Sequence, residues 1–316
     1  MPPLKRRRML AALPLVVLGA RTASAETKVT FGTAFEGGSF MVYALAFLDA
    51  MRTVDPNLEI ASVTTKGTEE NVPKLEAGEL DIAMVSGEIA HELFEGAGRS
   101  ATKLRVIVAM YSSPGMFAVR SDSRYRSIGE LKGKAVVWNG KGSGVAAQAR
   151  YVLDGLGLDP DKDFQAIYAI MTEGPAMVID GRATALWGSG LRWPGFIEMA
   201  NSARGARFIV PSAAEIKTIR DKHAFLRRIT VPAGLYRGQY DALETLGTWS
   251  YLLARADLGD ELGYRLAKDL YRVERAGTLS RVLVESTVKN TLSSLSSPDL
   301  LQPGVRRFYR EKALLQ

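Results

Sequence analysis

Strand and helix signals alternate along most of this chain, and their order limits the fold class. Four short apolar runs predict strands in the first part of the chain: residues 28–32, 58–63, 80–85 and 104–110. Between these runs, apolar residues spaced by three or four predict helices: residues 39–54, 68–75 and 88–94. Ser39 and Thr68 can cap the first two, and Ser143 opens a helix later in the chain. A repeated β-α-β order is typical of a parallel sheet covered by helices on both faces. We therefore predict an α/β fold.

A second series of the same kind follows Pro114-Gly115, which we interpret as a break between two strands. Its predicted strands are residues 116–119, 134–138, 164–168, 183–187 and 207–210. A long apolar segment follows at Leu243–Ala254, and a helical period then runs from Leu258 to Val273. Because the chain from Glu26 to Gln316 is longer than one average hydrophobic core accommodates, we predict two lobes.

Each lobe is predicted as a mostly parallel sheet flanked by helices, and the C-terminus as helical. We expect lobe I to comprise residues 26–113 and 246–316, and lobe II to comprise residues 114–245. The chain then crosses between the lobes twice, within Tyr111–Gly115 and within Thr245–Ala254.

Residues 1–25 predict a signal peptide. Lys5–Arg8 is cationic, Met9–Ala20 is apolar, and Ala23-Ser24-Ala25 supplies small residues for cleavage. The apolar run is shorter than a membrane span, which argues against an uncleaved anchor. We expect export to the periplasm and cleavage near Ala25. The pattern leaves the general and twin-arginine routes both open.

The charge balance argues against a nucleic-acid partner. The chain carries +7, but five of its 41 Lys and Arg residues and none of its 34 acids lie within residues 1–25. The mature part therefore carries 36 basic and 34 acidic residues, and no block of like charge that would bind a phosphate backbone. The absence of Cys excludes disulfides, a thiol nucleophile and a lipid anchor on cysteine.

Signals for catalysis are weak. The two histidines, His91 and His223, lack the H-E-x-x-H spacing of a metal site, and we interpret them as packed or solvated side chains. No G-x-S-x-G elbow is present. We therefore expect a protein that is not an enzyme, with no catalytic residue, no metal and no cofactor. A secreted α/β enzyme, such as a hydrolase, with an unrecognised carboxylate site stays open as an alternative.

Five glycine-rich turns join a predicted strand to a predicted helix, and they carry the functional prediction. They are residues 32–39, 66–68, 86–88, 139–144 and 187–190. Each presents free backbone N–H groups at the positive end of a helix, which favours a carboxylate or phosphate. A glycine can also serve only the tight turn. Five such turns at equivalent places in two lobes favour a shared cleft, and none matches a nucleotide-binding loop.

We predict that this cleft binds a small organic anion, such as an amino acid or a dicarboxylate. Trp138 and Trp187 are candidate cleft walls, with core packing as the alternative, and Lys141 or Arg192 could add a charge pair. The predicted ligand-binding residues are Thr33, Phe35, Gly37, Gly38, Ser39, Phe40, Thr68, Ser86, Gly87, Tyr111, Trp138, Asn139, Gly142, Ser143, Gly144, Trp187, Ser189 and Arg192.

Several loose motifs occur in an order that matches a known family. Gly32–Ser39 fits G-T-x-x-x-G-G-[ST], Thr65–Asn71 fits T-x-G-[ST]-x-x-N, and Asp81–Val85 fits a strand of small apolar residues. Later matches include Leu131–Lys134 and Pro303–Glu311. With these motifs, the chain resembles the TAXI solute receptors of TRAP transporters over residues 28–311.

The resemblance implies the two-lobed fold of type II periplasmic binding proteins. It also implies an extracytoplasmic solute-binding protein that delivers its ligand to the membrane subunits of a TRAP transporter. The chain departs from the family pattern at Phe40-Met41, which replaces two tyrosines, and at Ser86-Gly87-Glu88, which replaces Gln-Ser-Asp. A sensor that presents its ligand to a membrane kinase is the other alternative.

Overall fold

The structure is a computed structural model that describes residues 27–35, 38–97, 101–169, 172–277 and 280–315. The predicted signal peptide, its cleavage site near Ala25 and the predicted site residue Gly37 lie outside these residues. Among the described residues, no helix has both the length and the apolar character of a membrane span.

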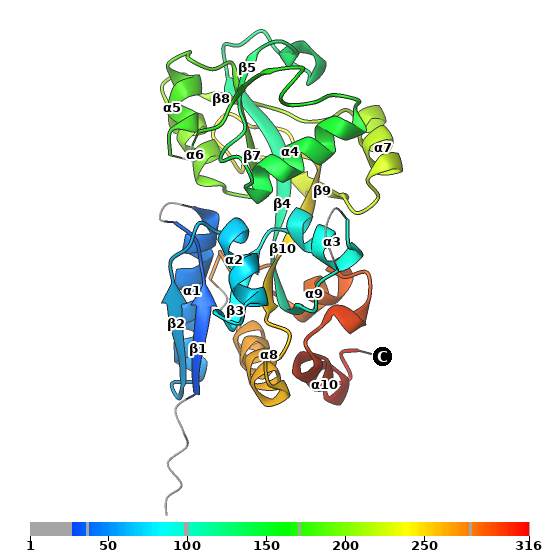
Figure 1. Ribbon diagram of the computed structural model, residues 1–316. Helices are drawn as coiled ribbons and strands as arrows, with labels where there is room; N and C mark the ends of the chain where they lie inside the picture. Colours follow the sequence, from blue (N-terminus) through cyan, green and yellow to red (C-terminus); the bar gives the residue numbers. More distant parts are fainter. Residues whose placement is uncertain (1–26, 36–37, 98–100, 170–171, 278–279, 316) are drawn as a thin grey trace, which may run out of the picture.

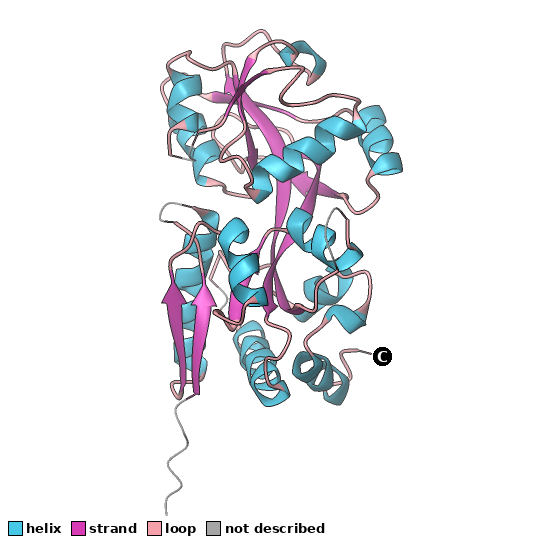
Figure 2. Ribbon diagram, in the orientation of Figure 1, coloured by secondary structure: helices cyan, strands magenta, loops and turns pink. Residues whose placement is uncertain are grey.

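The first lobe has the predicted β-α-β order (Figures 1 and 2). Its elements are β1 (Thr27–Gly32), α1 (Ser39–Val54), β2 (Leu58–Val63), α2 (Thr68–Glu76), β3 (Ile82–Val85) and α3 (Gly87–Glu95). β1 pairs in parallel with both β2 and β3, as the alternation predicts. Parallel pairing places the carboxyl ends of these strands at one edge of the sheet, where their turns into α1, α2 and α3 meet.

Two long antiparallel strands join the lobes, and one of them corrects the prediction. β4 runs without a break over Arg105–Arg120 and pairs with β10 (Leu243–Ala254), whereas the sequence predicts two strands separated at Pro114-Gly115. The Pro114 carbonyl accepts a hydrogen bond from the Gly190 N–H at 3.0 Å, on the side of the strand away from β10. The N–H that proline lacks therefore falls on that side, and the β10 ladder loses no donor.

The second lobe contains the remaining strands. Its elements are η1 (Gly129–Leu131), β5 (Ala135–Val137), α4 (Gly144–Gly155), β6 (Gln165–Ile167), α5 (Gly174–Ile179), β7 (Ala185–Ser189), α6 (Pro194–Asn201), β8 (Ala206–Ile209), α7 (Ala213–Lys222) and β9 (Arg227–Val231). β5 pairs in parallel with β6 and β7, while β4 pairs antiparallel with β7 and β8. β9, which the sequence analysis does not predict, pairs antiparallel with β10.

The C-terminal part is helical, as predicted, and returns to the first lobe (Figure 1). It contains α8 (Asp260–Arg275), α9 (Val288–Ser294), η2 (Pro298–Leu300) and α10 (Pro303–Glu311). The strands of both lobes form one mixed sheet in the order β2-β1-β3-β10-β4-β7-β5-β6, with β8 on β4 and β9 on β10. The α/β, two-lobed fold class is confirmed, and its parallel strands flank an antiparallel centre.

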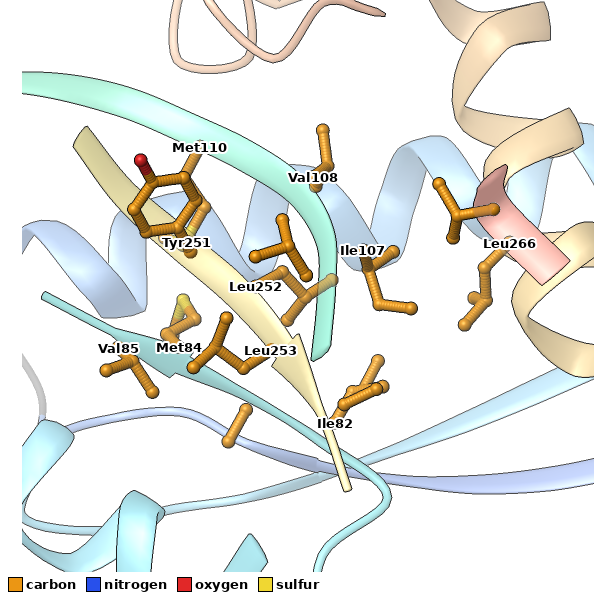
Figure 3. Packing of buried hydrophobic residues seen from close by; sticks show 14 of the residues in the cluster. Ile82, Met84, Val85, Ile107, Val108, Met110, Tyr251, Leu252, Leu253 and Leu266 are labelled. Carbon is orange, nitrogen blue, oxygen red and sulfur yellow. The ribbon is translucent and has the colours of Figure 1, made fainter. Parts of the chain in front are cut away.

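The buried side chains divide in the same way as the lobes. One apolar cluster draws its fully buried members from residues 29–110 and 251–309, and Figure 3 shows its centre, where Met84, Val108 and Leu252 pack between β3, β4 and β10. Two other clusters lie within residues 117–246 and 116–236. The lobe boundaries near residues 113 and 246 remain a prediction, and Leu246 packs in one of the second-lobe clusters.

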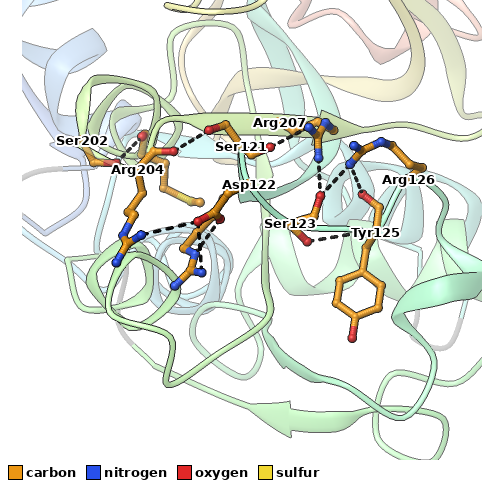
Figure 4. Close-up of polar contacts among 10 residues, drawn as sticks. Ser121, Asp122, Ser123, Tyr125, Arg126, Ser202, Arg204 and Arg207 are labelled. Carbon is orange, nitrogen blue, oxygen red and sulfur yellow. Dashed lines mark hydrogen bonds and ion pairs between the residues drawn. The ribbon is translucent and has the colours of Figure 1, made fainter.

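Polar contacts fix the far end of β4 in the second lobe (Figure 4). The Arg207 guanidinium, on β8, donates hydrogen bonds to the carbonyls of Ser121 and Ser123 at 2.5 and 2.6 Å. The Ser121 hydroxyl donates to the Arg204 carbonyl at 2.6 Å. These bonds hold the turn after β4 against β8.

Candidate functional site

A chamber of about 120 Å³ lies between the two lobes. The first lobe contributes α1, α2 and α3 with the loops that precede them, the second contributes the start of α4 and the end of β7, and the crossing strands form part of its wall. It is lined by Ala34, Phe35, Gly38, Ser39, Phe40, Lys66, Gly67, Thr68, Glu69, Ser86, Glu88, Tyr111, Ser113, Ser143, Gly144, Val145, Ser189, Trp193 and Ser250.

Helices from both lobes begin at the chamber, among them α1, α2 and α4. α1 and α2 begin after Gly38 and Gly67, and α4 begins after Ser143. Each helix N-terminus carries backbone N–H groups without a partner within the helix and a partial positive charge. The wall therefore offers donors from opposite sides to a bound anion, as the glycine-rich turns predict.

The residue predicted to cap the helix is the observed cap in only one of α1, α2 and α4. The Ser143 hydroxyl accepts the Ala146 N–H at 3.2 Å, so Ser143 caps α4 as predicted. Ser39 and Thr68 are the first residues of their helices, and glycines occupy the cap positions that we predicted for them. Gly67 has φ +84°, a left-handed conformation that an L side chain rarely adopts. The Thr68 hydroxyl instead accepts the Ser86 N–H at 3.0 Å.

Two buried donors that line the chamber lack a hydrogen-bond partner among the described residues. They are the Ser86 hydroxyl and the Trp193 indole N–H, in side chains that are 9 % and 1 % exposed. Leaving a buried polar group unpaired costs about 1–3 kcal/mol. Both atoms are buried in this conformation, so a solute in the chamber would pair with them only after a local movement of the wall.

Glu88 is a buried acid in the same wall. Its side chain is 2 % exposed, and one carboxylate oxygen accepts hydrogen bonds from Thr248 on β10 at 2.7 Å and from Gln148 on α4 at 2.9 Å. Burial raises the pKa of Glu88 to about 7, although these hydrogen bonds lower it. Glu69 and Lys66 also line the chamber, which therefore contains both signs of charge.

Ten of the predicted ligand-binding residues line this one chamber. They are Phe35, Gly38, Ser39, Phe40, Thr68, Ser86, Tyr111, Ser143, Gly144 and Ser189. The structure thus brings all five predicted turns to the chamber, together with Tyr111 of the crossing strand β4.

The two predicted cleft tryptophans lie in the core instead. Trp138 is 1 % exposed and Trp187 is fully buried, and both rings pack edge-on against Phe117. They belong to the apolar cluster beneath α4, and the Trp187 indole N–H donates to the Val145 carbonyl at 3.1 Å. Thr33 is also fully buried, and its hydroxyl donates a hydrogen bond to the Val63 carbonyl at 3.0 Å.

Four other predicted residues lie beside the chamber but do not line it. The Asn139 side-chain amide donates to the Trp187 carbonyl at 2.7 Å, and Gly142 (φ +91°) faces the Glu69 carboxylate. Gly87 lies against β10, where a Cβ would approach the Trp249 carbonyl oxygen to 2.2 Å. Arg192 lines a neighbouring cavity.

Sequence reasoning missed several residues of the wall. Ser113 and Ser250 come from the middle of the crossing strands, and no local motif marks them. Glu69 directly follows one predicted turn and Glu88 is the last residue of another, so their positions in the first helical turn could have identified them.

The lobes touch each other beside the chamber, so the structure is closed. A Cβ on Gly144 of α4 would lie 2.2 Å from the Ser86 hydroxyl oxygen in the first lobe. The Tyr151 hydroxyl, also on α4, donates to Glu92 on α3 at 2.9 Å. His91 stacks on Phe225 with 3.8 Å between ring centroids, which confirms that this histidine is packed. No cluster of metal-ligating side chains occurs within the described part of the chain.

Solved structures share this architecture. The periplasmic aliphatic sulphonate binding protein SsuA from Escherichia coli superposes with a TM-score of 0.53 and 17% identity, over 91% of this chain and 93% of that protein. The probable amino-acid ABC transporter extracellular-binding protein YtmK from Bacillus subtilis superposes with a TM-score of 0.51 and 15% identity, over 82% and 97% of the two chains. At such identity the likeness shows the fold alone. A family model described as "NMT1-like family" matches residues 31–313, and the chain therefore belongs to the NMT1-like family.

Proposed function

We propose that this protein is an extracytoplasmic solute-binding protein that closes two lobes around a small organic anion. The observation that carries the proposal is the chamber between the lobes, at which the N-termini of α1, α2 and α4 meet beside the unpaired donors of Ser86 and Trp193. A carboxylate bound there would accept hydrogen bonds from both lobes and hold them together.

The charges in the chamber favour an amino acid over a simple dicarboxylate. The helix N-termini complement a carboxylate, whereas Glu69 and Glu88 would complement an ammonium group. A dicarboxylate would place a second negative charge in a wall that already contains two acids and only Lys66 as a base. We therefore infer that the preferred ligand carries both an amino group and a carboxylate.

The proposed partner is the membrane part of a transporter. The order of the motifs from Gly32–Ser39 to Pro303–Glu311 supports a TRAP transporter of the TAXI type. YtmK, named above, is described as a binding protein of an amino-acid ABC transporter, so the type of transporter needs its own test. Uptake by vesicles that contain TRAP membrane subunits should require the loaded protein, and equal uptake without it would contradict this assignment.

Residues 1–25 support export to the periplasm, since they combine a cationic start, an apolar run and a small-residue cleavage site. We expect the mature chain to begin near Glu26. N-terminal sequencing of protein from the periplasm tests this expectation. A membrane-bound protein that still contained Arg6–Arg8 would contradict it.

Titration calorimetry tests the ligand class most directly. The mature protein would be titrated with α-amino acids, dicarboxylates, alkanesulfonates and, as cationic controls, primary amines without an acid group. We expect saturable binding of amino acids, weaker binding of dicarboxylates and no binding of amines. Tight binding of an amine, or catalytic turnover of any bound compound, would overturn the proposal.

A further inference from the structure

A second cavity adjoins the chamber and continues it along the cleft. Its volume is about 220 Å³, and it shares Ser39 and Tyr111 with the chamber. Like the chamber, it is lined from both sides, by α1 and residues 281–285 on one side and by residues 191–194 and 232–235 on the other. The site between the lobes is therefore larger than the chamber alone.

The lining of this second cavity is mainly apolar. Val42, Leu191, Leu235, Val282 and Val284 contribute aliphatic side chains, and two prolines add to them. Val42 and Val284 are 45 % and 59 % exposed, which is a large exposure for aliphatic side chains. Burial of such surface by a ligand is favourable by about 25 cal/mol per Å².

The charges in the second cavity are mainly positive. Arg192 and Arg281 line it, and no ion pair joins either guanidinium to a carboxylate of the described residues. The one acid in the lining, Glu285, accepts hydrogen bonds from the hydroxyl and the N–H of Ser112 at 2.7 and 3.3 Å. A cationic ligand group would therefore meet two arginines that are not paired with any carboxylate of the described residues.

Arg192, which lines the same cavity, has a strained backbone conformation. Arg192 has φ +58°, in the left-handed region that residues other than glycine rarely occupy. Its N–H donates to the Tyr236 hydroxyl at 3.1 Å, which holds this conformation. Strain that neighbouring residues maintain in this way is typical of ligand-binding segments.

We propose that the solute is an amphipathic organic acid whose head occupies the chamber and whose apolar, non-cationic body passes Ser39 and Tyr111 into the second cavity. This inference rests on the proposed function, because it takes the acidic head from that proposal. It adds the chemical class of the rest of the molecule. A ligand that consists of a head group alone would leave the second cavity empty and would gain nothing from its apolar wall.

Two homologous series of ligands test the inference. Calorimetry would compare alanine, norvaline and norleucine, and in parallel acetate, butyrate and hexanoate. We expect the affinity to rise about fourfold for each added methylene group that becomes buried. Lysine, which extends norleucine with an ammonium group, should bind more weakly than norleucine because of Arg192 and Arg281.

Substitutions in the lining of the second cavity supply a further test, and one substitution elsewhere on α1 supplies its control. Val42→Gln and the double variant V42Q/V284Q place polar groups in the second cavity at exposed positions. They should weaken norleucine binding several-fold and leave alanine binding unchanged. Leu45→Gln is the matched control, because Leu45 is exposed on the same helix and is not part of the cavity lining.

The outcomes separate this inference from the proposed function. If short acids bind and the affinity is the same for every chain length, or if lysine binds best, the amphipathic class is wrong and the proposed function still holds. If no acid of either series binds, the proposed function fails and the inference fails with it. Equal losses in V42Q and L45Q would also overturn the assignment of the second cavity.

Discussion

The side-chain amide of Gln148 donates a hydrogen bond to the carboxylate of Glu88 over 2.9 Å and thereby joins α4 to α3. The same amide nitrogen donates to the Ser113 carbonyl on β4 at 2.8 Å, and Thr248 of β10 donates to Glu88 at 2.7 Å. Glu88 therefore contacts the opposite lobe and β10 directly, and Gln148 links the pair to β4. These contacts lie next to the chamber, so closure and ligand binding involve the same residues.

Glu88 should make the stability of the fold depend on pH. Because the pKa of Glu88 is raised from 4.5 to about 7, its contribution to stability is complete below pH 4.5 and is lost as the pH rises through 7. Glu88→Gln removes this titration and keeps a side-chain oxygen for Gln148 and Thr248. Between pH 5 and pH 8 the wild type should lose on the order of 2–3 kcal/mol more unfolding free energy than E88Q, as measured by chemical denaturation.

Glu95→Gln is the control for this measurement, because Glu95 is exposed on the same helix. Its pH profile should match that of the wild type apart from a small effect through His91, whose pKa burial lowers and the charge of Glu95 raises. The nearby charge of Glu92 also raises the pKa of Glu88, so Glu92→Gln should lower that pKa slightly. If the wild type and E88Q lose stability in parallel from pH 5 to pH 8, Glu88 is not protonated in the folded state as we describe.

Gly144→Ala should prevent full closure of the lobes. The new Cβ would lie 2.2 Å from the hydroxyl oxygen and 2.3 Å from the Cβ of Ser86, and a rotation of the Ser86 side chain cannot move its Cβ. We expect at least a tenfold loss of ligand affinity by calorimetry, with little change in thermal stability. Gly140→Ala, in the same turn, adds a methyl group that has no neighbour within 4 Å and should bind normally.

A second substitution checks the cause of this loss. Ser86→Gly in the G144A background removes the side chain that the new methyl group meets. Closure should then be restored, and part of the affinity should return despite the loss of the Ser86 hydroxyl. An affinity in G144A equal to that of the wild type would show that α4 and Ser86 do not come together in the bound state.

Ser39 and Ser143 should each contribute to anion binding from one lobe. Both line the chamber at the start of a helix. A hydrogen bond to a charged group contributes about 1.5–3 kcal/mol, so Ser143→Ala should weaken binding of the acid roughly tenfold or more. The lost cap should cost only about 1 kcal/mol of stability. If S39A and S143A both bind the acid with unchanged affinity in calorimetry, the helix N-termini do not form the anion site.

The sequence predicted the fold well because the fold depends on local patterns. Helical spacing located α1, and apolar runs located β1, β2 and β3 within a few residues. Glycine-rich turns predicted where the cleft lies, since turns at the carboxyl ends of parallel strands gather at one edge. Ser39 and Ser143 were identified in this way, and the structure places them in one chamber.

The remaining residues of the site depend on packing between distant segments. Trp138 and Trp187 adjoin glycine-rich turns just as Phe35 does, but their side chains pack beneath α4, and only the assembled sheet decides this. Ser250 enters the wall because β10 pairs with both β3 and β4. Long-range pairing of this kind leaves no periodicity in the sequence near Ser250. The break predicted at Pro114 was wrong for the same reason, since its carbonyl is bonded to Gly190.

Closure should occur by rotation of the lobes about the crossing strands. β4 and β10 pair continuously past Pro114 and Gly247, and a Cβ on Gly247 would lie 2.2 Å from the Ser113 carbonyl oxygen, so the two backbones are in close contact at this point. Each lobe keeps its own apolar core on either side, so a small bend here moves each lobe as a rigid body.

Small-angle scattering should therefore give a smaller radius of gyration when the acid is bound than when it is absent. The G144A variant should keep the larger radius at saturating ligand, because its methyl group meets Ser86 before the lobes close. Identical scattering profiles of the wild type with and without saturating ligand would contradict rotation of the lobes, whatever the affinity of the acid.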